Sequence, residues 1–509
     1  MSSINVTNDT GGNAAAGRIG NYRWMICALL FFCTTINYID RNSLSVLKTT
    51  LQGALGWEDV DYGTITTAFT FAYAMFPSVI GIVIDKIGVK KALAAALVIW
   101  SFAAAAHGLV ATVLGFVIVR FILGFAEAAN FPASIKAVGM WFPQKERALA
   151  TGIFNSGTSI GVIASGGVVW IAVHLGWQMS FVAIGITGLV WLYFWQRYFS
   201  DPEHQSRLGQ AELDYIRSDQ PQAQKAMKLP WTTLMRYREI WPFLIGKLIT
   251  DPVWWFYLFW LPSYLDRERG QNPLNAGIWV AIIYTGSSIG SILGGWISST
   301  LMKRGWAVGK ARMTAMGLAA IFMPGSIFAY YTDSFGVCVA FITLATACHQ
   351  AWSANLFTNA TDLFPQKVSG SVVGLGATAG GIGGMFMTLL AGLAVQWTGN
   401  QQIVFVWAGL MHVLALALFW FWFKGRFVQI DVDKPLDVSR THGGLAISGG
   451  IVALAGTALA ALVFSNWGYL KDAVNVTGAV QSAVVAAAVF LIGLALIYAS
   501  RPKKASVPA

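Results

Sequence analysis

Six charged residues interrupt long apolar stretches of this sequence. Three are bases and three are acids: Arg41, Arg120, Lys247, Asp40, Glu127 and Asp251. A charge in the middle of a bilayer is costly, so such residues usually face the protein interior and mark ion or substrate pathways. A buried carboxyl group can take up a proton, and a guanidinium group binds a carboxylate through two parallel hydrogen bonds. The set therefore indicates an intramembrane site for an anion and for protons.

The alternative is that these charges only neutralise one another. Lys247 and Asp251 lie one helical turn apart, which suits a structural pair. Arg120 and Glu127 are seven residues apart and so share one face of a helix, where Arg120 could be a structural partner. Asp40 and its neighbour Arg41 could cap a helix end. Glu127 is flanked by alanines, and we expect a functional role for it.

The composition requires a membrane protein. The chain has 509 residues, of which 56% are apolar and 11% charged, whereas soluble domains are about 25% charged. The apolar residues form runs as long as the roughly 20 residues that a spanning helix needs. This excludes a soluble enzyme, a secreted disulfide scaffold and a disordered chain. The four cysteines all fall within apolar runs and indicate neither a disulfide framework nor a metal site: Cys27, Cys33, Cys338 and Cys348.

The apolar runs predict an all-α polytopic protein with fourteen spans. After a polar tail (1–22) without the features of a cleaved signal peptide, a first set of six (23–199) is expected at 23–46, 60–84, 89–107, 110–133, 147–172 and 177–199. A basic segment, 200–239, separates it from a second set (240–425) at 240–264, 274–301, 312–331, 334–359, 369–396 and 402–423. The remainder, 426–509, is expected to hold a linker, two extra spans at 444–464 and 479–499, and a basic tail.

The charge of the loops predicts the orientation. The net charge of +11 reflects Lys and Arg in short loops on one side, as in cytoplasmic loops, and does not indicate nucleic-acid binding. With a cytoplasmic N-terminus, only four bases fall in outside loops: Lys48, Arg267, Arg269 and Lys471. We therefore expect a multi-pass protein of the cell (inner) membrane with both termini in the cytoplasm.

Two short motifs recur and indicate a duplicated six-helix unit. Gly81-Ile-Val-Ile-Asp85, ending the second span, matches Gly295-Trp-Ile-Ser-Ser299 after 214 residues, and Phe142-Pro-Gln-Lys145 recurs as Phe364-Pro-Gln-Lys367 after 222. At these offsets Glu127 corresponds to His349, which precedes Gln350, and Asp40-Arg41 corresponds to Trp254-Trp255. Such amide, imidazole and indole groups suit the hydroxyls and apolar face of a sugar ring. Alternatively, His349 is a core histidine and the tryptophans face lipid.

The first loop resembles the signature of the major facilitator superfamily. The matching residues are Gly81, Asp85, Gly88, Lys90 and Lys91. The resemblance implies two six-helix bundles with a substrate site at the midplane between them. Ser299 departs from the pattern because the second copy usually has an acid there, so a symmetric cytoplasmic latch is not expected.

Further segments resemble the anion:cation symporter family within that superfamily. They are Asn37–Asn42, Arg120 with Gly124–Pro132, and Trp141–Arg147, while Lys247–Tyr257 and His349–Phe357 are similar to its hexuronate transporters. The likeness covers about 20–425. It implies that Arg41, Tyr73 and Arg120 hold a carboxylate and that Asp40 and Glu127 bind protons. The other expected substrate contacts are Lys247, Trp254, Trp255, His349, Gln350 and Asn355.

The resemblance implies a proton-coupled symporter that imports galacturonate or glucuronate by alternating access. Another sugar acid, such as galactonate or glucarate, or an organic carboxylate is the alternative. Galactonate-type relatives place an Asn in the eleventh helix, whereas 374–384 contains none here, so polar contacts should come from the seventh and tenth helices. The expected partners are the anionic sugar, protons and the bilayer, with the chain acting as a monomer.

Other classes of membrane protein fit the sequence less well. A membrane enzyme would need a metal or nucleophile constellation, and the six histidines have no ligand spacing such as H-E-x-x-H. A channel would not need coupled acid and base groups in paired halves. We therefore expect no enzyme activity, no cofactor and no metal.

Overall fold

The described part of the chain is helical. The computed structural model describes residues 19–219, 231–237, 239–271, 273–398 and 401–423, with 430 and 432, and within these ranges it has no strand. The predicted extra spans 444–464 and 479–499 lie outside the described residues. Ten helical segments in the described part are long and apolar enough to cross a membrane, and a bent helix pair makes an eleventh.

The first half contains ten α-helices. They are α1 (Tyr22–Val46), α2 (Lys48–Leu55), α3 (Asp59–Met75), α4 (Pro77–Ile87), α5 (Val89–Ala106), α6 (Val113–Glu127), α7 (Asn130–Trp141), α8 (Gln144–Ala164), α9 (Gly166–Leu175) and α10 (Trp177–Tyr198). Two short helices follow, α11 (Gln210–Arg217) and α12 (Trp231–Leu234). The second half contains α13 (Ile240–Arg267), α14 (Pro273–Lys303), α15 (Val308–Phe322), α16 (Gly325–Tyr331), α17 (Phe335–Leu363), α18 (Ser369–Thr398) and α19 (Gln402–Phe423).

Each of the first twelve predicted spans coincides with one helix or a consecutive pair, with two informative differences. The second span is broken, since α3 and α4 meet at an angle of 48°. Pro77, the first residue of α4, has no N–H to continue the α3 ladder. The fourth span was predicted to end at residue 133, which is wrong, because α7 continues to Trp141. Lys136, beyond the predicted end, is buried.

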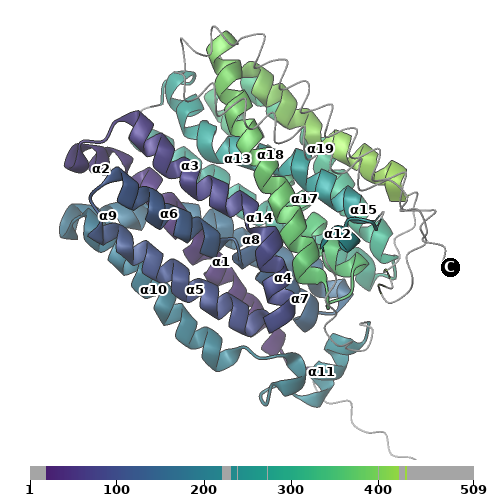
Figure 1. The fold of residues 1–509 in the computed structure, drawn as a ribbon. Coiled ribbons are helices and arrows are strands. Elements are labelled where there is room, and N and C mark those ends of the chain that lie inside the picture. Colours follow the sequence, from purple (N-terminus) through teal and green to yellow (C-terminus); the bar gives the residue numbers. More distant parts are fainter. Residues whose placement is uncertain are drawn as a thin grey trace, which may run out of the picture.

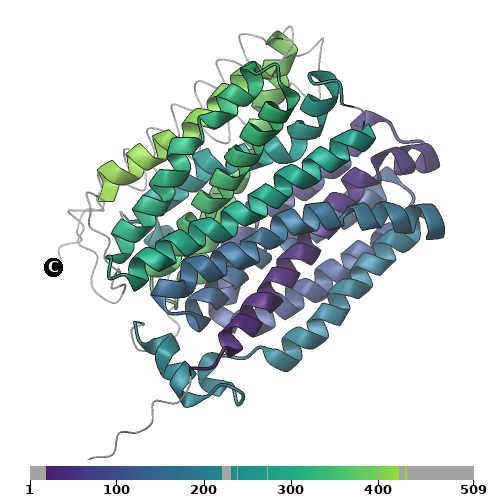
Figure 2. The same cartoon turned by 180° about the vertical axis from the view of Figure 1, so that it is seen from behind.

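The two halves lie side by side, and two pairs of helices make the most extensive contacts between them (Figure 1). One pair is α4 with α18, and the other is α8 with α14, which Figure 2 shows crossing closely from behind. Small residues permit these contacts. A Cβ atom at Gly81 would overlap the backbone of Gly370, and one at Gly152 would overlap that of Ser291.

The surface and the interior have the polarity expected of a membrane protein. Large apolar side chains are exposed on the outer helices, including Phe102 (62%), Trp170 (61%) and Ile321 (67%). Two charged side chains of the spanning helices, Arg120 and Glu127, by contrast lie inside. This arrangement reverses that of a soluble domain, whose ionised side chains are almost never fully buried without partners.

Helix α11 covers one end of the molecule, called the linker end below (Figure 1). Arg23 of α1 donates to Glu212 of α11 (3.0 Å) and to Glu146 of α8 (2.8 Å). The hydroxyl of Tyr215 also donates to Glu146 (2.8 Å). Burial, and then this hydrogen bond, raise the pKa of Tyr215 to about 12, so the phenol remains a donor at neutral pH.

Candidate functional site

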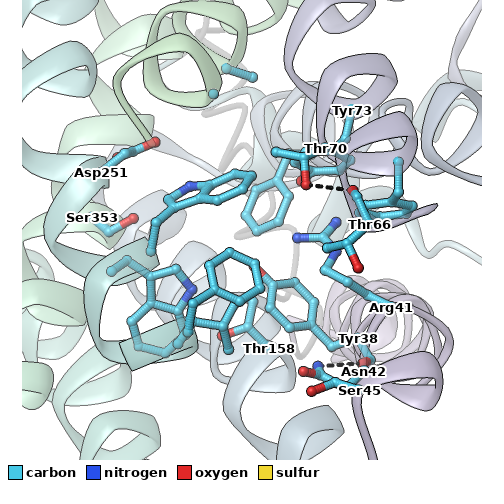
Figure 3. Close-up of a pocket in the computed structure, with 18 of the residues that line it drawn as sticks. Tyr38, Arg41, Asn42, Ser45, Thr66, Thr70, Tyr73, Thr158, Asp251 and Ser353 are labelled. Atoms are coloured by element: carbon cyan, nitrogen blue, oxygen red, sulfur yellow. Dashed lines mark hydrogen bonds between the residues drawn. The ribbon is translucent and has the colours of Figure 1, made fainter. Parts of the chain in front are cut away.

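A cavity of about 1030 Å³, open mouth included, lies between the two halves. Its lining includes exposed residues such as Ser45 and Phe259. Figure 3 shows Arg41, Thr66 and Thr70 on one wall, facing Asp251 and Ser353 on the other. The helices that supply the lining are α1, α3, α6, α7 and α8 from the first half, and α13, α17 and α18 from the second.

Eight of the expected site residues line this cavity. They are Arg41, Tyr73, Arg120, Lys247, Trp254, Trp255, His349 and Gln350. Asp40 and Glu127 lie buried beside it, 2% and 0% exposed. Asn355, also expected to contact the substrate, is not part of this lining. Its amide donates instead to the backbone carbonyls of Gly294 and Ala351, because α14 and α17 pack closely there.

Arg41 is held between aromatic rings on the first wall. Its guanidinium carbon lies 3.9 Å from the ring centre of Tyr73 and 4.5 Å from that of Tyr38. Its Nη2 atom donates to Glu127 Oε2 at 3.3 Å and to Asn37 at the same distance. Ring faces attract a cation without neutralising it, so Arg41 keeps its positive charge at the cavity wall.

Arg120 is buried without full hydrogen bonding. It is 2% exposed, and its Nε and Nη2 atoms have no hydrogen-bond partner among the described residues. Its guanidinium carbon lies 5.7 Å from the ring centre of Phe69, the ring that also faces Arg41 at 5.4 Å. Unpaired buried donors on a cation are costly. Arg120 and Arg41 both line the cavity, so two guanidinium groups border the same space.

The two acids of this half differ in their partners. Glu127 pairs with Arg41 through one oxygen, while Oε1 has no hydrogen-bond partner in the part of the chain that is described. Neither carboxyl oxygen of Asp40 has one there. An isolated buried carboxylate is unfavourable, and binding a proton removes the charge. Both carboxyl groups are thus buried without full hydrogen bonding among the described residues.

The second wall is aromatic. The ring of His349 stacks on that of Trp254, with centres 5.7 Å apart and an interplanar angle of 11°. Trp255 faces Tyr73 across the cavity at 6.4 Å. His349 Nδ1 shares a hydrogen bond with Nε2 of His412, a buried residue of α19 (3.1 Å). These rings form an apolar surface that carries one imidazole.

Amides and charges complete the second wall. Gln350 accepts a hydrogen bond from Asn155 Nδ2 (2.7 Å) and donates one to Thr158 Oγ1 (3.2 Å), both on α8 of the first half. Lys247 Nζ pairs with Asp251 Oδ2 at 2.5 Å. Among the described residues no cluster of His, Cys, Asp or Glu suits a metal ion.

The family of the protein follows from comparison with known sequences. The model of the Major Facilitator Superfamily matches residues 30–388. The chain belongs to the major facilitator superfamily. It is therefore a multi-pass membrane protein of a transporter family and not an enzyme, and the resemblance found in its motifs is confirmed.

Its relatives within the superfamily are named as sugar-acid transporters. The "Hexuronate transporter" of Escherichia coli is 30% identical over 408 residues, covering 78% of this chain and 92% of the relative. A "D-galactonate transporter" of Escherichia coli is 27% identical over 415 residues, covering 79% and 95%. A solved structure of FucP in the outward conformation aligns with a TM-score of 0.61 and 16% identity, over 79% of this chain and 99% of that one. This last likeness shows the fold alone.

The superfamily's signature loop forms a contact between the halves at the linker end. Asp85 accepts hydrogen bonds from the backbone N–H groups of Gly370 (3.0 Å) and Ser371 (2.7 Å) at the start of α18, and from Lys136 Nζ (2.5 Å). Gly88 has φ of 85°, which suits glycine in the turn before α5. Lys90 and Lys91 follow at the start of α5, half-buried and exposed.

The second half closes this end with a different acid. Ser299 is buried and its hydroxyl has no hydrogen-bond partner among the described residues. Asp362, at the end of α17, instead binds Arg147 of the first half (3.2 Å) and Arg312 of α15 (3.0 Å). Two acids, Asp85 and Asp362, therefore connect the halves at the linker end, but they do not occupy corresponding positions in the two halves.

Several lining residues were missed by the sequence reasoning. Tyr62, Thr66 and Thr70 of α3 line the cavity together with the expected Tyr73, and their spacing of three to four residues places all four on one helical face. That stripe was a usable signal. Asn155 and Thr158 of α8 had none, since small polar residues are common throughout that span.

Proposed function

We propose that the protein is a proton-coupled symporter that imports hexuronates, galacturonate and glucuronate, across the cytoplasmic membrane. The observation that carries the proposal is the buried, incompletely bonded guanidinium of Arg120 beside that of Arg41 in a cavity open at one end. A monoanionic ligand with hydroxyl groups suits both the charged wall and the aromatic wall of the cavity. Its carboxylate pairs with the arginines, and its ring lies against the indoles and the imidazole.

The proposal includes the orientation and the division of the chain. Basic loops favour a cytoplasmic linker end and cytoplasmic termini. The structure then corresponds to an outward-facing form, because the linker end is closed by Asp85 and Asp362. Residues 23–199 and 240–425 would be the two bundles that rock about the central site, and the protein would act as a monomer.

Proton uptake is proposed to prepare the site for the sugar acid. A proton on Glu127 removes its attraction for Arg41, 3.3 Å away, and leaves that guanidinium free for the ligand carboxylate. Asp40 gives a second buried position for a proton beside the same arginines. When the bundles rock and the proton leaves toward the cytoplasm, Glu127 pairs with Arg41 again and displaces the ligand. One proton per monoanion makes this cycle electroneutral.

Glu127→Gln tests the coupling. The amide keeps the shape of the side chain but cannot carry a proton, so uptake driven by a pH gradient should be abolished while galacturonate exchange across proteoliposomes remains. Glu203→Gln is the matched control, because Glu203 lies outside the cavity and pairs with the exposed Arg217 (2.9 Å). Normal gradient-driven uptake by Glu127→Gln would exclude Glu127 from the coupling.

The second candidate is another sugar acid. Relatives named as D-galactonate and galactarate/D-glucarate transporters, 27–29% identical, support it. Competition of labelled galacturonate uptake by galactonate, glucarate and an aromatic carboxylate, at two pH values, distinguishes these substrates. Stronger competition by galactonate than by glucuronate would favour the alternative.

A further inference from the structure

Lys247 and Asp251 form an ion pair that faces the cavity from the second half. Their charged atoms are 2.5 Å apart, and both residues belong to the cavity lining. The side chain of Lys247 is 3% exposed, whereas that of Asp251 is 17% exposed. Asp40 and Glu127 are 2% and 0% exposed. Asp251 is thus the acid of these three that solvent in the cavity reaches best.

Few other ionisable groups face this pair. On α17 there is His349, and behind it His412 on α19; on α14 there is Tyr284, which packs against Trp254. Helix α18, which packs most extensively against α13, contains no ionisable residue. Across the cavity, the ionisable residues of the lining are Tyr38, Arg41, Tyr62, Tyr73 and Arg120. Lys247 is accordingly the cation that balances Asp251 at this wall.

A proton on Asp251 would change what Lys247 can bind. The ion pair is neutral as a whole, but protonation of the carboxylate leaves the ammonium group without its counter-charge. Its remaining support is the ring of Phe357, whose centre lies 3.7 Å from Nζ. A buried, uncompensated ammonium is costly, and an oxygen atom of a ligand in the cavity can take the place of the carboxylate. Proton binding and ligand binding are coupled at this wall as well.

The pair also lies next to a contact between the halves. A Cβ atom at Gly380 of α18 would overlap the carboxylate of Asp251, and one at Gly381 would lie 2.7 Å from Ala74 Cα of α3. The backbone of α18 therefore lies between Asp251 and α3 of the first half. One turn after Asp251, Trp255 faces Tyr73 of α3. A change of charge at Asp251 acts where α3, α13 and α18 meet.

We propose that Lys247 and Asp251 are a second proton-binding pair, carried by the second half, which adds one proton per cycle to those carried by the first half. This rests on the proposed symport of a sugar acid. The proton binds Asp251 Oδ2 from the open cavity, while Lys247 keeps its three protons and turns to a ligand oxygen. On the other side of the membrane the proton leaves, and the ion pair forms again.

The proton-to-substrate ratio tests the proposal. It is obtained in proteoliposomes from the pH gradient at which a fixed galacturonate gradient gives no net flux. The ratio should fall by one in Asp251→Asn and in the double variant Lys247→Gln with Asp251→Asn. The double variant removes both charges together, so it avoids leaving a buried ammonium unpaired and keeps the test available if the single variant fails to fold. An unchanged ratio in either variant would overturn the proposal.

A measurement without transport separates this proposal from the proposed function. Infrared difference spectra of the purified protein at high and low pH should contain a carboxyl band that is lost in both Asp251 variants and kept in Glu203→Gln. Absence of that loss would overturn the second proton site, whatever the protein transports. If the wild type takes up no sugar acid, but the carboxyl band is present in the wild type and lost in the Asp251 variants, the proposed function fails and the proton site stands.

Discussion

The two halves of the molecule share two short recurring motifs but differ in how their charges are satisfied at the cavity. In the first half, Arg120 and Asp40 have buried polar atoms without partners among the described residues. In the second, Lys247 pairs with Asp251, and His349 bonds to its neighbour on α19. The first wall therefore has charged groups whose hydrogen-bonding atoms are not all paired. The charged groups and the imidazole of the second wall are already paired with protein groups, and this wall presents aromatic rings and amides.

The halves also differ at the linker end. The first half ends its second span with Asp85, which reaches across to the backbone of α18. The corresponding Ser299 makes no such bond among the described residues, and the acid has moved to Asp362, at the end of a different helix. A duplicated fold thus preserves a contact between the halves without preserving the residue that makes it.

Removal of Asp362 should have the largest effect on stability. Asp362→Asn leaves the buried guanidinium groups of Arg147 and Arg312 without their shared carboxylate. Breaking such a buried pair costs about 3–5 kcal/mol, so the thermal midpoint of the purified protein should fall clearly. Glu203→Gln, which breaks an exposed pair, serves as the control. Equal midpoints for the two variants would show that Asp362 is not needed to close the linker end.

Removal of the incompletely hydrogen-bonded guanidinium of Arg120 should have the next largest effect, which is on the affinity for the ligand. Arg120→Gln takes away the charged donors that the ligand carboxylate would satisfy, and loss of a charge-assisted hydrogen bond with burial costs about 2–3 kcal/mol. Galacturonate affinity, measured by calorimetry, should fall about 100-fold. Arg217→Gln on α11 is the matched control. Retained affinity in Arg120→Gln would place the anion elsewhere in the cavity.

Loss of the hydrogen bond between His412 and His349 should have a smaller effect on ligand affinity. His412→Phe keeps a ring at this buried position but removes the hydrogen bond of 3.1 Å, worth about 1 kcal/mol. We expect a loss of about fivefold in affinity and a changed preference between galacturonate and glucuronate. His174→Phe, at an exposed position on α9, is the control. An unchanged preference would mean that the imidazole does not contact a hydroxyl group.

The smallest effect on stability is expected at Ser299, which takes the place of Asp85 in the second copy of the motif. Ser299→Ala removes a hydroxyl that has no hydrogen bond within the described ranges, so the free energy of unfolding should change by less than about 0.5 kcal/mol. Thermal unfolding provides the measurement. A destabilisation comparable to that of Asp362→Asn would contradict the asymmetry of the two halves at this end.

The sequence predicted those features that depend on local composition. Apolar runs located the first twelve spans, and the cost of intramembrane charge singled out Arg41, Arg120 and Glu127 before any geometry was known. Features that depend on packing could not be predicted in this way. The fourth span was predicted to end before Lys136, whose partner, Asp85, is 51 residues away in the sequence. His412 stood alone in an apolar run, and only the approach of α17 and α19 shows its role.

Helix α11 lies between the halves in sequence, but its bonds belong almost entirely to one of them. Arg23 and Glu146, to which α11 is bonded, are both in the first half. From the second half, Lys303 lies 3.6 Å from Glu146 of α8, with half of the Lys303 side chain in solvent. Exposed pairs of this kind contribute little. When the two halves separate at the linker end, α11 should move together with the first half. The segment of the chain that changes conformation should then lie after α11.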